Sequence, residues 1–519
     1  MDMNNSFVDE RMSSSEQEIE LEMCDRSVVS ELSSDFSLSD YQPEIKRLLR
    51  VTASMLPPTK YFGAGQAEFA GNIDYYVLYM GADNEIYCAP LSGEYSVSLP
   101  IDKDDYIDLG DQLITDVKIV PDMISGRVTS PRHITVKCRL KTNAKIYGRG
   151  KVMSTVTACD GSVEKLKGDV QNMRMCLGVG DTINLTDEII PDMRDGEFRV
   201  VCADGRVLVN EVSGGKDEVI CRGELNLKLM ISRENGDQPT VSTRRIPFSN
   251  IIACEGVTPE SAVCAKGTLS ELTLTVDEGR ILVEAGVIIE VTGQTNRTVT
   301  YISDIYSTKN ACECNYRELN VSSSVAGFNR NFTFSESLPL ENTQISEGVT
   351  VVDACGNSVI EDYKFENGKC KMLGKCKFNL QFYDGNDYAA SELEMPFKYE
   401  YDMPEGVYEN VKCTAEPSVI SCRARLDGER IGVDAEISVC GRMWDEKKCV
   451  ILESYRLGEE LGRNSGEIIV CYPSRNDTLW SVGKKYNASI VDLCRVNKLP
   501  QNTAPDEIIL KNVVDYVVI

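Results

Sequence analysis

The sequence predicts a mainly β protein: three tandem repeats, each resembling a β-sandwich or open barrel, and then a small α+β domain with the order βααβ. Two observations support this prediction. Apolar residues alternate with period two in three stretches about 150 residues apart, and the last stretch of the chain changes to helical spacing. The length of 519 residues leaves room for about three or four domains.

Each of the three stretches has a glycine followed by an alternating run. The glycines are Gly71, Gly223 and Gly374, which are 152 and 151 positions apart. Every second residue after each glycine is apolar: Ile73, Tyr75, Val77 and Tyr79; Leu225, Leu227, Leu229 and Ile231; Cys376, Phe378, Leu380 and Phe382. This period is typical of a strand with one buried face. Each run then reaches a turn rich in Gly, Asn and Asp, as a hairpin requires.

A second landmark recurs further along each stretch. It is an arginine, at Arg132, Arg280 and Arg430, with spacings of 148 and 150. Because two distant landmarks keep nearly the same separation, we expect three units that each hold a core. A recurring charge also predicts a recurring partner, an acid in the same unit. The expected repeats span 24–160, 165–308 and 325–460, with linkers at 307–324 and 457–466.

Charge restricts the class of partner. The net charge is −26, so the chain lacks the general basic field that nucleic-acid binding needs. Residues 1–40 hold eleven acids and two arginines, and we expect residues 1–23 to be disordered. The acidic start is unlike an export signal, and no apolar run is long enough for a bilayer. We therefore expect neither export nor membrane insertion.

The terminal domain, 467–519, alternates between strand and helix signals. A strand is expected at 467–472, and a helix follows, capped by Asp477 or Thr478 and ended by Asn487. Ser489 can cap a second helix, and 507–511 is the expected returning strand. The tail 512–519 predicts an added strand, or an edge that a partner covers. The apolar residues at helical spacing are Leu479, Val482, Tyr486, Ile490 and Leu493.

This domain resembles a LysM module, the small fold known for binding N-acetylated glycans. The resemblance is carried by Asp477, Thr478, Leu479, Trp480, Tyr486, Leu493 and Asn497. Glycan-binding members have a glycine before the aspartate and another before the last strand. Here Asn476 and Asp506 occupy those positions, so the backbone is less free to approach a sugar. The resemblance implies a glycan- or partner-binding set of Asn476, Asp477, Thr478, Leu479, Trp480, Lys484 and Asn497.

Trp480 allows two interpretations. It is either an aromatic anchor for a partner or a ring packed over the junction of helix and sheet. The densest basic cluster on the chain is likewise either a site for an acidic partner or a solvated face. Its members are Arg475, Lys484, Lys485, Arg495 and Lys498.

The three repeats resemble the SPOCS domain of clostridial spore-coat assembly proteins, over residues 24–460. SPOCS-type repeats followed by a LysM module imply a non-enzymatic adaptor in the mother-cell cytoplasm. Its implied partner is a SpoIVA-like morphogenetic ATPase at the forespore surface. The alternative is a LysM protein that binds peptidoglycan or N-acetylglucosamine in the cell wall or spore cortex.

Catalytic signals are absent from the sequence. No G-x-x-x-x-G-K-[ST] motif occurs, and the single histidine, His133, lies in an expected strand. The 20 cysteines include no C-x-x-C pair, so we expect buried free thiols rather than zinc sites. Examples in apolar runs are Cys138, Cys221, Cys254, Cys376 and Cys440. We therefore expect no enzyme activity, no cofactor and no metal.

Overall fold

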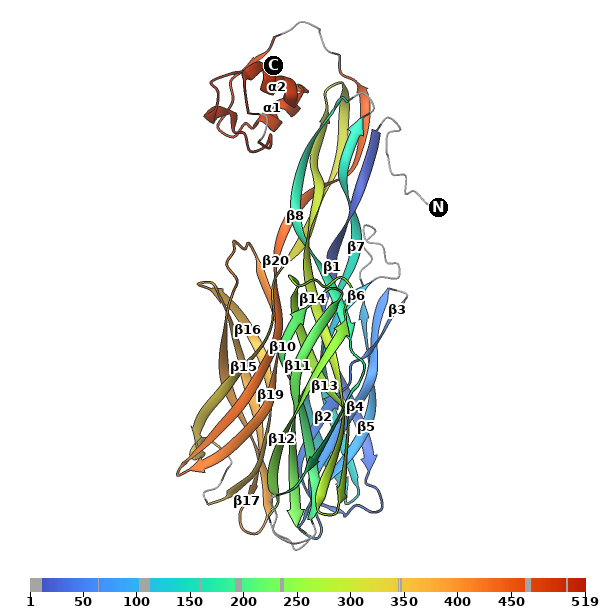
Figure 1. The fold of residues 1–519 in the computed structure, drawn as a ribbon, viewed down its shortest axis with the longest axis vertical. Helices are drawn as coiled ribbons and strands as arrows, with labels where there is room; N and C mark the ends of the chain where they lie inside the picture. Colours follow the sequence, from blue (N-terminus) through green and yellow to red (C-terminus); the bar gives the residue numbers. More distant parts are fainter. Residues whose placement is uncertain are drawn as a thin grey trace.

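In the part of the chain that the structure describes, the protein is mainly β, with two short α-helices near the C-terminus (Figure 1). The computed structural model describes residues 12–519 except 64, 102–112, 159–160, 192–197, 234–237, 344, 346–347, 463–467 and 501–502. The strands of the first stretch are β1 (Met12–Ser37), β2 (Ile45–Met55), β3 (Thr59–Gly63), β4 (Gln66–Gly81), β5 (Ile86–Pro100), β6 (Ile114–Ser130) and β7 (His133–Ala158).

Two further stretches of strands follow. The second contains β8 (Val163–Val179), β9 (Ile183–Ile189), β10 (Phe198–Gly214), β11 (Glu218–Arg233), β12 (Thr240–Ala253), β13 (Ala262–Asp277) and β14 (Arg280–Ser307). The third contains β15 (Asn310–Pro339), the 3₁₀ turn η1 (Leu340–Asn342), β16 (Thr350–Glu366), β17 (Lys369–Tyr383), β18 (Tyr388–Asp402), β19 (Val411–Asp427) and β20 (Arg430–Glu460).

Each stretch builds two antiparallel sheets that share a core. In the first sheet the opening strand pairs with the closing strand, giving the orders β1-β7-β6, β8-β14-β13 and β15-β20-β19. The second sheets contain β2-β4-β5, β10-β11-β12 and β16-β17-β18. The predicted alternating runs lie on β4, β11 and β17, and their apolar side chains are buried between the two sheets.

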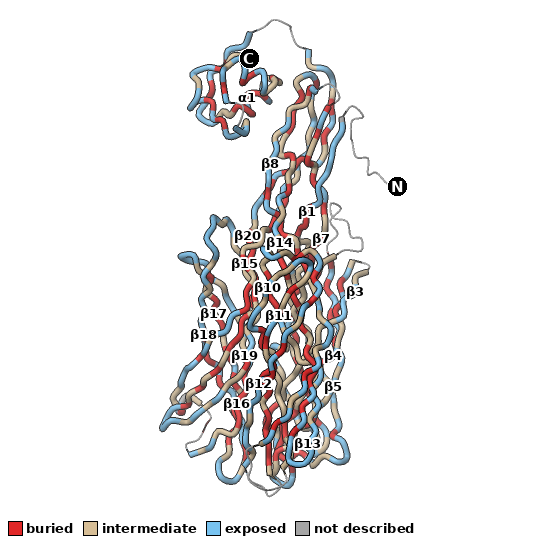
Figure 2. The backbone as a smooth tube through the Cα atoms, viewed as in Figure 1, coloured by how far each residue is buried: buried red, intermediate tan, exposed pale blue. Residues whose placement is uncertain are grey.

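The long paired strands continue beyond the sheets and form a stalk (Figure 1). The stalk consists of the outer ends of three ribbons, β1–β7, β8–β14 and β15–β20. All three ribbons contribute to its apolar core, as Figure 2 shows by the buried residues that continue into it. The core includes Ile19, Val152, Val170, Val299, Leu319 and Ile451. Because a two-stranded ribbon is marginal alone, each ribbon depends on the other two.

A small head follows the stalk and comprises residues 468–519. It contains β21 (Val470–Cys471), α1 (Leu479–Tyr486), α2 (Ile490–Asn497), the 3₁₀ turn η2 (Leu510–Asn512) and β22 (Val517–Val518). Both predicted helices are confirmed, and so are their caps. Thr478 accepts a hydrogen bond from Ser481 N, Asn487 takes the left-handed conformation at the end of α1, and Ser489 caps α2.

The predicted returning strand at 507–511 is wrong. Ile509 makes only an isolated bridge with Thr478, and η2 follows directly. The strand that pairs with β21 is β22, which lies in the tail 512–519 where an added strand was expected. The two strands close the head around a core that includes Leu479, Leu493, Ile508 and Val517.

Three expectations of irregular chain are also wrong, in whole or in part. Disorder was expected for 1–23, but residues 12–23 belong to β1 and pair with β7; residues 1–11 lie outside the described part. The linker expected at 307–324 is mostly β15, whose register with β20 begins at Asn310. The linker expected at 457–466 is strand through Glu460, and 463–466 lie outside the described residues. In each case the pairing strand is over a hundred residues away, so local composition gave no sign of it.

The recurring arginines do not share an acidic partner. Arg280 Nη1 lies 2.9 Å from Glu188 Oε1, as expected. Arg132 instead donates to the backbone carbonyls of Ser39 and Gln42, and Arg430 donates to the hydroxyl and carbonyl oxygens of Ser337. All these partners lie within the arginine's own stretch.

Candidate functional site

Trp480 of the predicted site lies in a contact between the head and the stalk. It sits in the first turn of α1, and only 5% of its surface is exposed. The indole Nε1 donates to Asp304 Oδ2 on β14 at 2.8 Å. The ring also meets Tyr306 edge to face, with 4.9 Å between centroids. The indole is therefore covered by the body of the same chain.

Lys484 lies one helical turn after Trp480 and reaches the same carboxylate. Its Nζ is 2.6 and 2.8 Å from the two oxygens of Asp304. Tyr316 on β15 donates its hydroxyl to that carboxylate as well. Burial alone would raise the pKa of Asp304, but the hydrogen bonds from Lys484, Tyr316 and Trp480 hold it below its usual range. The carboxylate is therefore ionised at neutral pH, with three donors around it.

Three further contacts complete the interface. Tyr306 donates its hydroxyl to Ala488 O at 2.7 Å, and Ile490 N donates to Glu164 Oε1 at 3.1 Å. Gly483 lets α1 approach closely, because a Cβ at that position would lie 2.6 Å from the Tyr306 hydroxyl. The start of β8 and the end of β14 thus form a polar and aromatic seat for the head.

The other residues of the predicted set have structural contacts inside the head. Leu479 belongs to its core and Thr478 caps α1. Asp477 accepts a hydrogen bond from Ser474 N at 2.8 Å. Asn497 exchanges hydrogen bonds with the backbone of Val518 at 2.8 and 2.7 Å, which fixes β22. Asn476 is exposed on the surface.

Backbone hydrogen bonds join the start of α1, and the residue pair before it, to residues 505–510. Leu479 N donates to Ile508 O and Trp480 N donates to Pro505 O, both at 3.0 Å. Leu510 N donates to Asp477 O, also at 3.0 Å. These donors are therefore already used within the head and are not directed toward solvent.

The seat itself was missed by sequence reasoning. Glu164, Asp304, Tyr306 and Tyr316 come from strands of the second and third stretches. Nothing in the local sequence marks them, because their common feature is proximity to a head that lies at the far end of the chain. Asp304, for example, lies 176 residues before Trp480 in the sequence.

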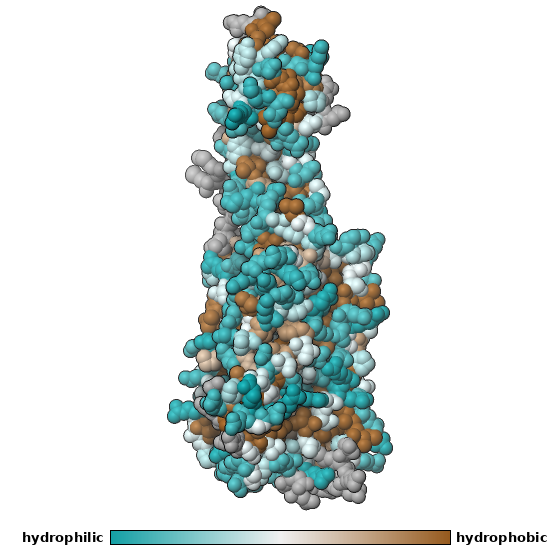
Figure 3. Space-filling model, turned by 90° about the vertical axis from the view of Figure 1, so that its left-hand side faces the viewer, coloured by the Kyte–Doolittle hydropathy of each residue, from teal (hydrophilic) through white to brown (hydrophobic). Residues whose placement is uncertain are grey.

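Away from the seat, the head exposes several apolar side chains, and Figure 3 shows apolar surface on this part of the molecule. Tyr472 and Tyr516 lie with ring centroids 6.4 Å apart, next to the strand pair β21–β22. Both rings are largely exposed, with 75% and 53% of their surface accessible. Ile468, Val491, Val496 and Val513 are exposed as well. So many exposed apolar side chains on so small a domain are typical of an interaction surface.

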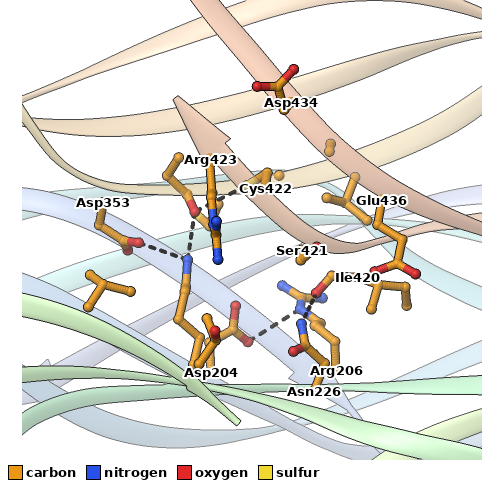
Figure 4. Close-up of a pocket in the computed structure, with 18 of the residues that line it drawn as sticks. Asp204, Arg206, Asn226, Asp353, Ile420, Ser421, Cys422, Arg423, Asp434 and Glu436 are labelled. Carbon is orange, nitrogen blue, oxygen red and sulfur yellow. Dashed lines mark hydrogen bonds and ion pairs between the residues drawn. The ribbon is translucent and has the colours of Figure 1, made fainter. Parts of the chain in front are cut away.

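A polar cavity of about 630 Å³ lies between the second and third stretches (Figure 4). Three ion pairs line its walls. Lys228 Nζ lies 2.8 Å from Asp353 Oδ1, Arg206 lies 3.3 Å from Asp204, and Arg245 lies 2.6 Å from Glu436. The first and third pairs connect different sheets, whereas Asp204 and Arg206 both lie on β10.

Next to this cavity lies a buried cation from the first stretch. Arg50 on β2 is 2.9 Å from Asp353 on β16, and both side chains are almost fully buried. Lys228 on β11 contacts the same carboxylate, so all three stretches meet at one acid. A second such point is Glu416 on β19, between Lys118 and Lys266. Burial alone would raise its pKa, but the two lysines lower it to about 2.

The expectation of free thiols inside the apolar strands is confirmed for the cysteines that the sequence singled out. Cys138, Cys221, Cys254 and Cys376 are buried free thiols, and Cys440 is a half-buried one. Within the described ranges, no three His, Cys, Asp or Glu side chains gather to hold a metal ion. His133 has a local contact, 2.8 Å between its Nδ1 and Ser130 Oγ.

The described chain is thus a mainly β protein with a three-ribbon stalk and a small helical head seated against it. None of its described helices has the length and apolar content needed to cross a bilayer. Comparison with protein-family models, curated proteins and solved structures finds no match to this chain.

Proposed function

We propose that the protein is a non-enzymatic adaptor of spore-envelope assembly, similar to SipL. In this proposal three SPOCS-type repeats form the scaffold, and a LysM-type head docks on a SpoIVA-like morphogenetic ATPase. The protein would act in the mother-cell cytoplasm and be recruited to the forespore surface. Nucleotide hydrolysis belongs to the partner.

The observation that carries the proposal is the surface of the head. It holds exposed Tyr472 and Tyr516 beside further exposed aliphatic side chains, and it lies at the end of a long β body. Exposed aromatic residues are frequent anchors of protein interfaces. The repeat assignment is supported by the strand order, since each stretch pairs its opening strand with its closing strand.

Two features favour a protein partner over a glycan. The backbone donors of Leu479 and Trp480 are occupied by Ile508 and Pro505. The ring of Trp480, on which a sugar could stack, is covered by Tyr306. A glycan would therefore have to displace contacts that the chain makes with itself.

The test is binding of the purified full-length chain to a purified SpoIVA-class ATPase. We expect Tyr472→Ser with Tyr516→Ser to weaken binding at least about tenfold, while circular dichroism of the body stays unchanged. Unchanged affinity would exclude this surface. Trp480→Glu is expected to abolish binding if the α1 face is the interface, and unchanged co-purification would remove Trp480 from it.

Asp304→Asn separates the two surfaces. It weakens the contact between head and stalk without altering any residue of the head. Affinity for the partner should therefore rise if the partner binds the face of α1 that holds Trp480 and Lys484. It should stay unchanged if the partner binds the surface that holds Tyr472 and Tyr516. Sedimentation with purified peptidoglycan tests the alternative. Strong retention of the full chain that Trp480→Glu abolishes would overturn the adaptor proposal in favour of glycan binding.

A further inference from the structure

Two cysteine thiols lie side by side on the stalk, close to the seat of the head. Cys312 and Cys314 are two positions apart on β15, so their side chains share one face of the strand. Their sulfur atoms are 3.5 Å apart, and both residues are only partly buried. Both are therefore more accessible to an oxidant in solution than the fully buried thiols of the sheets.

The backbone around this pair departs from a regular ladder. The register between β15 and β20 shifts between Asn310 and Cys312 and again between Asn315 and Tyr316. Two irregularities thus enclose the cysteines. β-Bulges bend a strand locally, so this segment can adjust more easily than the rest of the ribbon.

The two thiols differ in acidity. The hydrogen bond from Cys312 lowers the pKa of Cys314 to about 7, although burial acts in the opposite direction. By contrast, burial raises the pKa of Cys221 to about 12. The thiolate is the nucleophile in disulfide exchange, so Cys314 is the attacking group of the pair.

We propose that Cys312 and Cys314 form a reversible disulfide within β15 by exchange with a small disulfide such as oxidised glutathione. The Cys314 thiolate attacks one sulfur of the oxidant and releases one glutathione thiolate, which takes up a proton. Cys312 then loses its proton and attacks the mixed disulfide at Cys314. The new Cys312–Cys314 bond forms, and the second glutathione leaves and takes up a proton. The two cysteines have then lost two electrons, which have reduced the oxidised glutathione to two glutathione thiols.

Geometry indicates that this bond is easily reduced again. Residues two apart in an extended strand have Cα atoms about 6.6 Å apart, from a rise of about 3.3 Å per residue. Disulfides accept about 4.4–6.8 Å, so the bond forms only near the upper limit or with local bending. Strained disulfides of this kind are reducible and suit a switch rather than a permanent cross-link.

The thiol pair lies close to the contacts that hold the head. Cys314 is two positions before Tyr316 on the same face of β15, and Tyr316 donates its hydroxyl to Asp304, the acceptor of Lys484 and Trp480. Forming the disulfide draws the Cys314 sulfur toward Cys312 and away from Tyr316. We therefore expect oxidation to loosen the seat and expose Trp480. This inference does not depend on the identity of the partner in the proposed function.

Peptide mapping tests the modification. The folded full-length chain is incubated at pH 7 with defined ratios of reduced and oxidised glutathione, quenched with acid, alkylated and digested with trypsin. Cleavage after Lys309 and Arg317 isolates residues 310–317, which contain only these two cysteines. The oxidised form of this peptide carries no alkyl group and is two hydrogens lighter than the reduced form. We expect it to form at least about ten times faster than the Cys221 peptide, 217–222, is modified.

Two results would overturn the proposal. One is a peptide 310–317 that keeps two alkyl groups, and the other is a peptide that stops at a mixed disulfide with glutathione. Cys312→Ser should stop at that mixed disulfide, which checks the order of attack. Acrylamide quenching measures the effect on the head, because Trp444 is only 2% exposed and Trp480 reports the seat. Oxidation should raise quenching in the original chain and not in Cys312→Ser/Cys314→Ser.

Discussion

The indole Nε1 of Trp480 donates a 2.8 Å hydrogen bond to the carboxylate of Asp304, 176 positions earlier in the chain. Lys484 reaches the same carboxylate from the next turn of α1. The residue expected to meet a partner is thus engaged within the molecule. Any partner that uses the α1 face competes with the stalk, and its apparent affinity falls by the fraction of heads that are docked.

Asp304→Asn is expected to release the head. It removes the charge that Lys484 pairs with, and hydrogen bonds to charged groups contribute about 1.5–3 kcal/mol. The docking equilibrium should shift about ten- to a hundredfold, seen as increased acrylamide quenching of Trp480. Asp169→Asn is the matched control, because Asp169 lies on β8 of the stalk and bonds only to Thr300 in the described contacts. Equal quenching in both variants would contradict the role of Asp304.

Gly483→Ala is expected to separate helix stability from docking. Alanine should stabilise α1 by about 1 kcal/mol, since glycine is a poor helix former. Its Cβ would lie 2.6 Å from the Tyr306 hydroxyl, so docking should weaken. Trp480 quenching measures this change. Tyr306→Phe removes the clashing oxygen but also its hydrogen bond to Ala488 O, so the double variant is compared with Tyr306→Phe alone. Equal quenching in these two would place the clash at the Tyr306 oxygen, and higher quenching in the double variant would place it elsewhere, at Ile490.

Glu20→Gln is expected to stabilise the protein near neutral pH. Glu20 is buried in the stalk, and burial raises its pKa to about 7 from 4.5 in spite of the hydrogen bond from Met175 N. The folded state therefore holds the proton more tightly, and stability is lost as pH rises from about 4.5 to 7. Above pH 7 the variant should gain about 1–3 kcal/mol, with little difference near pH 4. Urea unfolding at both pH values measures this; a gain that is the same at both would contradict it.

Arg50→Met is expected to destabilise the body by about 2–4 kcal/mol. It leaves Asp353 buried with Lys228 as its remaining cationic partner. Chemical denaturation with a two-state fit provides the measurement. Arg222→Ala is the control, because its pair with Glu211 is exposed and should contribute below about 1 kcal/mol. A similar loss of unfolding free energy in both variants would show that the buried pair contributes no more to stability than the exposed pair.

The sequence predicted those parts of the fold that depend on local periodicity. Period two at Leu225–Ile231 places every second side chain in a core, and helical spacing with Thr478 and Ser489 caps fixes α1 and α2. The strand of residues 12–23 was not predictable in this way. Its sequence is acidic and polar, and it becomes a strand because β7 offers a partner and Ile19 and Leu21 enter the stalk core.

The candidate site was predictable only in part. The sequence singled out Trp480 by its match to a LysM opening and Lys484 as a member of a basic cluster, but it could not assign their contacts. Those contacts depend on Asp304, Tyr306 and Glu164, whose positions follow from the long-range pairing of β8 with β14. Leu479 and Asn497 also show that part of the pattern serves the fold of the head itself.

The three-ribbon stalk sets an order of assembly. β1 can pair with β7 once residue 158 has left the ribosome, but the core they share with the third ribbon lacks one side until β20 is made. The seat at Asp304 lies on the second ribbon, and the head is synthesised after β20. During synthesis the head therefore meets a stalk that is already complete, and a chain that ends before residue 430 leaves the apolar faces of two ribbons uncovered.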